Sequence, residues 1–267
     1  MPSVLFVLTS ASKTLTDAPT VSFFRASCES LSTEIHVSNA FCSLRYLPEA
    51  AHPYYVLAPH ATIDFASPAG PNPPIDEGSV KMFESDPECT KFLADETVKS
   101  KLASAKKLSE VSSKGEHSAR MFHSHHANNP GKDYDAIFYV GGHGPVIDLA
   151  VDPVNIKLAS EFYQAGKITA AVCHGPAGLV GVTDAEGKSI FAGKAATGFS
   201  NAEETQVGKV KDVPFLLEDK IVSLGGKYEK AADPWGSHVV VDGNLYTGQN
   251  PASAGPIGQA ILKALKV

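Results

Sequence analysis

One cysteine, Cys173, lies where an α/β protein would carry a nucleophile. It follows the apolar segment Ile168–Val172 and precedes a turn of small residues that begins with His174. This pattern is typical of a strand, a sharp turn and a helix, with the side chain held at the turn. Unpaired amides of the first helical turn and the helix dipole would favour the thiolate, and the His174 amide could bind a developing oxyanion. The sequence therefore predicts a nucleophilic thiol, against the alternative of an inert strand cysteine.

Strands and helices alternate along much of the chain, and they decide where Cys173 can lie. Apolar or alternating runs predict strands at residues 4–10, 62–68, 133–144 and 168–172. Capping patterns and apolar spacing predict helices at residues 49–59, 86–105, 152–166 and 255–265. Residues 238–248 predict a hairpin that turns at Asp242 and Gly243. This alternation implies an α/β fold, with a mostly parallel sheet covered by helices on both faces.

Two loops that follow predicted strands carry residues suited to a ligand site. One contains Gly141, Gly142 and His143, and the other contains Cys173. Because loops at the carboxyl ends of parallel strands gather in one crevice, we expect both loops to border a single site. His143 would either line this crevice or pack its own loop.

Composition limits the classes of function. The chain has 267 residues with 43% hydrophobic content, which is most simply one α/β domain over residues 1–267. Acids outnumber lysine and arginine by 29 to 23, so we expect no broad basic face for nucleic acid. The N-terminal apolar run is too short for a signal core or a membrane span, and no other stretch approaches about twenty apolar residues. We expect a soluble cytoplasmic protein with no membrane partner, and a nuclear location is also compatible.

Neither the cysteines nor the histidines predict a metal centre. The four cysteines, at positions 28, 42, 89 and 173, form no CxxC pair and no Cys/His spacing typical of structural zinc. A reducing compartment is consistent with this usage. His123, His125 and His126 form a cluster that could bind a metal, but no carboxylate or cysteine stands at ligand spacing, and a solvated loop is favoured. We expect no metal and no cofactor.

Four separated motifs stand out along the chain. In chain order they are YLPEAAHPY at 46–54, YVGGHGPVIDL at 139–149, AVCHGPAGL at 171–179 and TGQNPASA at 247–254. Together they resemble the ThiJ/PfpI superfamily, whose members are like class I glutamine amidotransferases, and within it the chain is similar to the fungal heat-shock chaperone and glyoxalase III branch. The resemblance covers nearly the whole chain and implies a flavodoxin-like sandwich with a nucleophile elbow, in agreement with the alternation of strands and helices.

The resemblance also implies a set of catalytic residues. Cys173 matches the family nucleophile, His174 the adjacent histidine, and Glu49 the acid beside the thiol. A carboxyl group so close to a thiolate must be protonated or share a proton with it, because two bare anions repel. The other interpretation of Glu49 is a solvated first-turn glutamate. Counting from the TGF triplet favours Glu204 as the partner of the histidine, with Glu203 as the alternative if the loop is tighter.

Three further residues match family positions around the pocket. The backbone of Gly142 resembles the donor that faces the nucleophile and, with the amide of His174, would complete an oxyanion site. His143 is a further candidate for substrate binding. Trp235 matches a position near the pocket mouth, although a core or rim aromatic is the simpler interpretation.

The reaction that the resemblance implies is a glutathione-independent conversion of methylglyoxal and related 2-oxoaldehydes to 2-hydroxy acids such as D-lactate. This is a lyase activity of the glyoxalase III, or D-lactate dehydratase, type. Cys173 would form a hemithioacetal, and Glu49 or His174 would carry a proton between the two substrate carbons. The expected partner is a small 2-oxoaldehyde, and relatives suggest a homodimer.

Two other classes of function stay open. One is a stress-responsive holdase that binds unfolded proteins, with Cys173 as an oxidation sensor. The other is a cysteine peptidase or amidotransferase, which is less favoured because no late HxE-type pair is present. A segment at about residues 20–45 also departs from the family and enters just before Glu49. It is interpreted as an insertion that forms a lid, a partner-binding flap or a translated intron.

Overall fold

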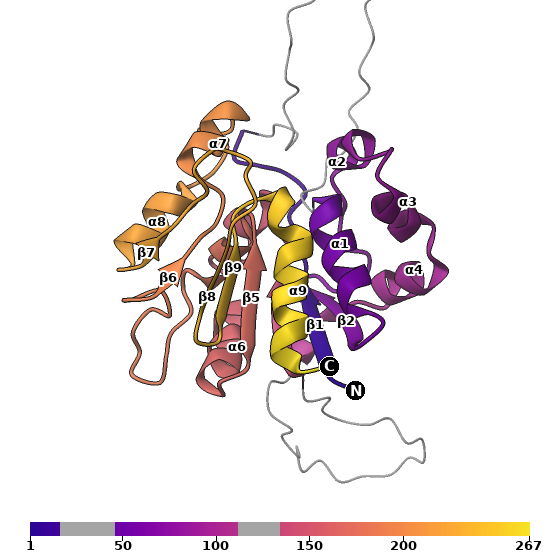
Figure 1. Cartoon of the computed structure of the whole chain (residues 1–267), viewed down its shortest axis with the longest axis horizontal. Helices are drawn as coiled ribbons and strands as arrows, with labels where there is room; N and C mark the ends of the chain where they lie inside the picture. The colour runs from indigo at the N-terminus through magenta and orange to yellow at the C-terminus, as the bar shows by residue number, and fades with distance from the viewer. Residues whose placement is uncertain (17–45, 112–133) are drawn as a thin grey trace, which may run out of the picture.

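A computed structural model describes residues 1–16, 46–111 and 134–267 of the protein (Figure 1). The insertion at about 20–45 and the histidine cluster at 123–126 lie outside the described residues. The main sheet has the strand order β3-β2-β1-β4-β5-β9-β8, and its neighbouring strands are parallel except for the β8–β9 pair. The expected mostly parallel sheet is therefore confirmed. Its strands are β1 (Ser3–Val7), β2 (Thr62–Ser67), β3 (Lys106–Lys107), β4 (Ala136–Tyr139), β5 (Ile168–Val172), β8 (Val239–Asp242) and β9 (Leu245–Gly248).

The register of the central strands brings the functional loops together. Val7 of β1 pairs with Tyr139 of β4, and Tyr139 pairs with Ala171 of β5. Val172 pairs in turn with Gly248 of β9. The chain therefore leaves β1, β4 and β5 at one edge of the sheet, so the loops that follow these strands are neighbours. All residues of β1 and β4 are buried, which explains why these strands read as continuous apolar runs rather than as alternating ones.

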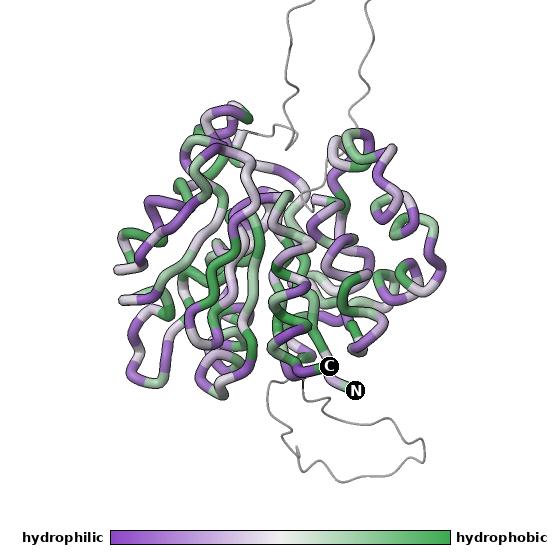
Figure 2. Tube along the Cα trace, in the orientation of Figure 1, coloured by the Kyte–Doolittle hydropathy of each residue, from purple (hydrophilic) through white to green (hydrophobic). Residues whose placement is uncertain are grey.

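Helices cover both faces of this sheet (Figure 1). The helices α1 (Leu47–Leu57) and α9 (Ala254–Leu265) pack against each other, and α9 also contacts β5 and β9. The helix α6 (Pro153–Gln164) contacts β4 and β5. The hydropathy of the chain explains this arrangement. In Figure 2 the central strands are mostly hydrophobic, whereas the outer helices alternate between polar and apolar residues, so each helix can bury one side against the sheet. Asp152 begins α6 as predicted, because its carboxylate accepts hydrogen bonds from the first-turn amides.

The predicted long helix at residues 86–105 is wrong. The structure has two helices there, α3 (Pro87–Ala94) and α4 (Glu96–Ala103). Asp95 separates them because its backbone is extended and its side chain accepts hydrogen bonds from the amides of Thr97 and Val98. An aspartate side chain that caps a new helix favours ending the preceding one. The apolar residues continue at helical spacing across Asp95, and this spacing led to the prediction of a single helix.

The predicted hairpin is present, but its turn lies one residue later than expected. β8 ends at Asp242 and β9 begins at Leu245, so Gly243 and Asn244 form the turn. Gly243 has a φ of +67°, which explains a glycine at this place.

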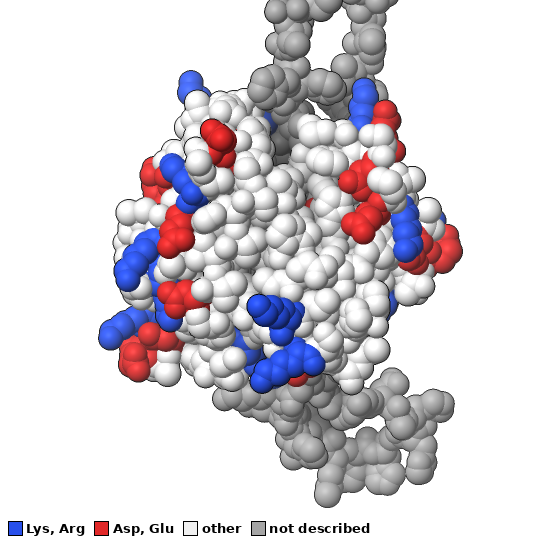
Figure 3. Space-filling model, viewed as in Figure 1, with Lys and Arg blue, Asp and Glu red and all other residues white. Residues whose placement is uncertain are grey.

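Shorter elements complete the described structure. They are α2 (Glu77–Met82), α5 (Gly144–Ile147), α7 (Asn201–Gln206), α8 (Leu217–Ser223), the paired strands β6 (Ala195–Ala196) and β7 (Lys227–Tyr228), and 3₁₀ turns at Leu108–Glu110, Gly175–Leu179 and Pro251–Ser253. Among these described helices, none is both long and apolar enough to cross a bilayer. On the face that Figure 3 shows, side chains of both signs lie toward the left and right margins, and a small basic group lies at the lower centre.

Candidate active site

Cys173 sits at a strained turn between β5 and the 3₁₀ turn Gly175–Leu179. Its φ is +59°, a left-handed conformation that residues other than glycine rarely adopt. Two backbone hydrogen bonds hold it there: its N–H donates to the carbonyl of Gly248, and its own carbonyl accepts from the N–H of Phe199, at 2.9 and 2.8 Å. The elbow is therefore present, but the expected helix after it is a five-residue 3₁₀ turn. Such a short turn has too small a dipole to stabilise a thiolate strongly.

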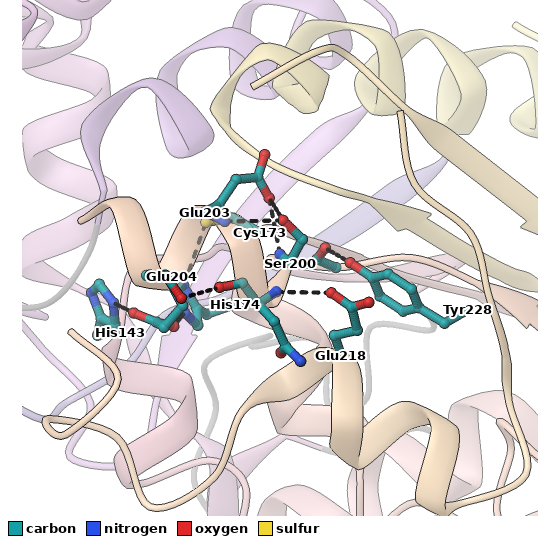
Figure 4. A network of polar contacts seen from close by, with 11 residues as sticks. His143, Cys173, His174, Ser200, Glu203, Glu204, Glu218 and Tyr228 are labelled. Carbon is teal, nitrogen blue, oxygen red and sulfur yellow. Dashed lines mark hydrogen bonds and ion pairs between the residues drawn. The ribbon is translucent and has the colours of Figure 1, made fainter. Parts of the chain in front are cut away.

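His174 connects the thiol to a buried carboxylate (Figure 4). Its Nδ1 lies 3.5 Å from Cys173 Sγ, and its Nε2 lies 2.6 Å from Glu204 Oε2. Burial and the neighbouring His143 lower the pKa of His174 despite the attraction of Glu204, so we expect a neutral ring. A neutral ring that donates its Nε2 proton to Glu204 leaves a lone pair on Nδ1. That lone pair faces the sulfur and can accept its proton.

Glu204 serves two histidines at once. Its Oε2 pairs with His174, whereas its Oε1 lies 2.9 Å from His143 Nε2. The centroids of the His143 and His174 rings lie 4.2 Å apart. Burial opposes ionisation of Glu204, but the two imidazoles hold its pKa well below the usual range, so it stays a carboxylate. His143 therefore borders the site as expected, and its contact with Glu204 is a feature that the sequence did not indicate.

Glu49 is fully buried in the first turn of α1 and faces Cys173. A solvated glutamate, the alternative interpretation of this position, is excluded. Burial raises its pKa to about 8, although the thiol and the amides of Gly141 and Gly142 partly offset this. Neither carboxyl oxygen makes a hydrogen bond of good geometry within the described residues, so both are available to a substrate.

The same environment keeps the thiol protonated. Burial raises the pKa of Cys173 well above the usual value, and the charge of Glu49 raises it further, whereas the Gly142 amide lowers it. The expectation that the elbow amides favour a resting thiolate is therefore wrong. Desolvation and a facing carboxyl outweigh one amide and a short 3₁₀ turn. The thiolate must form when a base removes the proton, and His174 is placed to do so.

Gly141 allows the carboxyl and the thiol to approach each other. A Cβ at this position would collide with Oε2 of Glu49 and would lie 2.8 Å from Cβ of Cys173. The backbone carbonyl of Val172 would be only 2.6 Å away. Every side chain larger than hydrogen would therefore push the acid away from the sulfur.

Glu203, the alternative partner for the histidine, has a different role. Its side chain is fully buried, and five donors surround its two oxygens. Oε2 accepts from the N–H and hydroxyl of Ser200 at 2.9 and 2.7 Å. Oε1 accepts from Trp235 N–H, Gln249 Nε2 and Asn250 Nδ2 at 2.9, 3.0 and 2.8 Å. It thus ties the start of α7 to two other loops. The SNAE capping box at residues 200–203 and the QN pair at 249–250 were the available sequence signals.

A cavity of about 1000 Å³ opens above these side chains. Glu49, Gly142, Cys173 and both histidines line its base. The rest of its wall is largely apolar and includes Tyr46, Pro48, Met82, Phe83, Val207, Pro251 and Pro256. A largely apolar wall with a few polar groups converging at its base is typical of a site for a small molecule.

Trp235, for which the family resemblance implied a place near the pocket mouth and a core or rim aromatic was the simpler interpretation, is a partly exposed residue that lines this cavity. Trp235 is 37% exposed, and its ring centroid lies 5.6 Å from that of Phe199. The ring centroid of Phe199 lies in turn 4.3 Å from that of His174. The hydrogen bond from Trp235 N–H to Glu203 fixes the backbone of the rim. The rim is thus connected to the histidine through two aromatic contacts.

Donor atoms of His143, His174 and Glu204 all lie within 4.8 Å of one another, which is close enough to hold a metal ion. Both carboxylate oxygens take part in short contacts to the imidazoles, so these residues also form a hydrogen-bonded relay that begins at the thiol.

Fold and site together define a class: flavodoxin-like α/β proteins with a cysteine at a nucleophile elbow and a histidine–carboxylate pair behind it. Comparison with known families agrees. Residues 88–264 match the profile of the DJ-1/PfpI family. The chain belongs to this family, and the resemblance expected from the motifs is confirmed.

Curated relatives carry consistent names. The glutathione-independent glyoxalase HSP31 of Saccharomyces cerevisiae is 39% identical over 140 residues, which cover 50% of this chain and 59% of the relative. Glyoxalase 3 of Candida albicans is 34% identical over 140 residues, with the same shares of 50% and 59%. The chain therefore spans about three fifths of the length of these relatives.

Solved structures match over nearly the whole chain. The rapid encystment protein REP24 of Francisella tularensis is 32% identical, with a TM-score of 0.77 and coverage of 99% of both chains. Glyoxalase III of Candida albicans has a TM-score of 0.75 at 24% identity, covering 98% of this chain and 97% of its own. The second match supports the fold alone.

Proposed function

We propose that the protein is a glutathione-independent glyoxalase, a lyase that converts methylglyoxal and related 2-oxoaldehydes to 2-hydroxy acids. The product from methylglyoxal would be D-lactate. The observation that carries the proposal is the position of an acid with a pKa of about 8, Glu49, against the thiol of Cys173 in a largely apolar cavity. The names of the yeast relatives support it.

The first step would be formation of a hemithioacetal. Cys173 Sγ attacks the aldehyde carbon as its proton passes to Nδ1 of His174, which lies 3.5 Å away. The carbonyl π bond becomes an oxyanion, which receives the proton back from the imidazolium. The Gly142 amide, which points at the sulfur, and the His174 amide are the donors for this oxyanion. Glu204 stabilises the transient positive charge on His174.

The second step would move a proton between the two substrate carbons. The minor fraction of Glu49 that is ionised near neutral pH removes the proton from the former aldehyde carbon, giving an enediolate, and returns this proton to the neighbouring carbon. The hydroxyl proton on the first carbon passes to the oxygen of the second, so that a carbonyl forms beside the sulfur. A base whose pKa lies near neutral pH suits both halves of this transfer. The result is a thioester, which water hydrolyses to the hydroxy acid and the free thiol. One substrate carbon is oxidised and the other reduced, so water is the sole co-reactant.

The full chain, incubated with methylglyoxal in buffer free of glutathione, tests this proposal. Lactate is measured with D-specific and L-specific lactate dehydrogenases. We expect D-lactate from the wild type and none from Cys173→Ala. A folded wild type that forms no lactate contradicts the proposal.

The same preparations test the remaining alternatives. Suppressed aggregation of an unfolded client, unchanged in Cys173→Ala, would support the holdase, and ammonia released from glutamine would support the amidotransferase.

A further inference from the structure

A second group of side chains close enough to hold a metal ion lies one helical turn from Glu49, between α1 and α3. His52 Nε2 is 3.0 Å from Asp86 Oδ2 and 4.0 Å from Cys89 Sγ. Donor atoms of these three residues lie within 4.8 Å of one another. A fourth possible donor atom, the carboxylate oxygen Oε2 of Glu88, is 4.0 Å from His52 Nε2. The catalytic steps above use none of these side chains.

The donor types suit one class of ion. A thiolate, an imidazole and a carboxylate form a set typical of Zn²⁺, which prefers tetrahedral sites. With Zn–N and Zn–O near 2.0 Å and Zn–S near 2.3 Å, tetrahedral angles place nitrogen about 3.3 Å from oxygen and about 3.5 Å from sulfur. The observed separations of 3.0 and 4.0 Å differ from these values by a few tenths of an ångström, which small side-chain rotations correct.

The site is built on fixed elements. Asp86 begins α3, and its other oxygen, Oδ1, accepts the N–H of Cys89 at 2.9 Å, so Oδ2 is held toward His52. Cys89 is fully buried in the first turn of α3. His52 and Asp86 keep about a quarter of their side chains exposed, which gives an ion a path of entry. A carboxylate with one oxygen bonded to the backbone and one directed at the site is an arrangement common around metal ligands.

We propose that His52, Asp86 and Cys89 form a Zn²⁺ site, with Glu88 or water as the fourth ligand. On binding, the Cys89 thiol releases its proton to solvent and a Zn–S bond forms. The neutral His52 ring then carries its proton on Nδ1, and Nε2 coordinates the ion. Asp86 Oδ2 loses its hydrogen bond with His52 Nε2 and coordinates the ion instead.

This site would brace the helix that carries the acid of the active site. Pro53 lies inside α1 and has no N–H to donate to the carbonyl of Glu49. α1 is therefore weakened in the turn that follows Glu49, and a metal bridge from His52 to α3 spans that turn. Zinc should accordingly raise the thermal stability of the whole chain by mass action.

Cobalt titration of the full chain, prepared free of metal, tests the assignment. We expect one equivalent of Co²⁺ to produce a thiolate-to-cobalt charge-transfer band, which Cys89→Ser abolishes. Zn²⁺ competition should show affinity at least about tenfold weaker in Cys89→Ser and in His52→Gln. Zn²⁺ should raise the melting temperature of the wild type and not that of Cys89→Ser.

Matched variants separate this site from the other thiols. Cys173→Ser and a Cys28→Ser/Cys42→Ser double variant should keep the band. Absence of the band in the wild type, or its survival in Cys89→Ser, overturns the proposal. The metal-free chain is assayed with methylglyoxal separately, so failure of the glyoxalase proposal and failure of this one are distinguishable.

Discussion

The carboxyl group of Glu49 and the thiol of Cys173 face each other without a side chain between them, because residue 141 is a glycine. Burial raises the pKa of both groups; the charge of Glu49 raises the pKa of Cys173 further, whereas the hydrogen bond from the thiol lowers that of Glu49. In the resting site at neutral pH, we therefore expect the Glu49 carboxyl and the Cys173 thiol to be mainly protonated. Chemistry begins when a substrate lets the thiol lose its proton.

Glu49→Gln should leave the fold intact and lower kcat for methylglyoxal by about 100-fold to 10,000-fold, with a smaller change in KM. The amide fills the same buried space but cannot accept a proton from carbon. Steady-state kinetics measure this, with circular dichroism as the control for folding. A kcat close to that of the wild type would rule out Glu49 as the proton carrier.

The same variant should change how stability depends on pH. The folded-state pKa of Glu49 is raised to about 8 from a model-peptide value of 4.5. Its contribution is therefore fully present below the unfolded pKa and is lost as pH rises through about 8, by up to about 1.4 kcal/mol per pH unit. Urea unfolding from pH 5 to pH 9 should show Glu49→Gln gaining stability relative to the wild type across this window. A constant difference between the two proteins would contradict burial of an ionisable carboxyl.

Reactivity of Cys173 toward alkylation should shift to lower pH in Glu49→Gln. The charge of Glu49 raises the pKa of the thiol, so its removal favours the thiolate. Alkylation by iodoacetamide, followed peptide by peptide by mass spectrometry, reports the midpoint. Cys89, buried in the same chain, serves as the internal reference. An unchanged midpoint would show that the two groups do not interact.

Gly141→Ala should lower turnover by about 100-fold or more and should also destabilise the protein. The new methyl group would collide with the Glu49 carboxyl and press on Cys173, and overpacking of this kind costs about 1–3 kcal/mol. Gly255→Ala is the matched control for stability, since a Cβ there meets nothing within 4 Å. Thermal melts of both variants decide the matter, and equal melting temperatures would count against the predicted collision.

Two adjacent glutamates should respond differently to loss of charge. Glu203→Gln would place an amide nitrogen against the donors that surround its oxygens, and we expect a loss of unfolding free energy of about 3 kcal/mol. Glu204→Gln should lower kcat markedly and the free energy of unfolding only slightly, because the Glu204 carboxylate stabilises the positive charge that forms on His174 during the reaction. Urea unfolding and kinetics on both variants give the comparison. A catalytic defect confined to Glu203→Gln would reverse these roles.

Local features of the site could be predicted from sequence. The apolar run before Cys173 and the small residues after it fix a strand and a sharp turn, and His174 is adjacent whatever the fold. The parallel sheet also followed, because alternating strands and helices leave few other ways to bury both faces. The prediction that Asp152 caps a helix was also correct, because a helix cap depends only on residues two or three positions away in the sequence.

Tertiary structure decided which distant groups meet. Glu203 and Glu204 differ by one position, yet successive helical side chains diverge by about 100°, so one faces the histidines and the other ties three segments together. The contact of His143 with Glu204 and the protonated state of Cys173 also depend on packing, since burial and charge at a site come from several elements at once. Sequence determined that a cysteine and a histidine stand at an elbow. The assembled core determined which acid touches each of them.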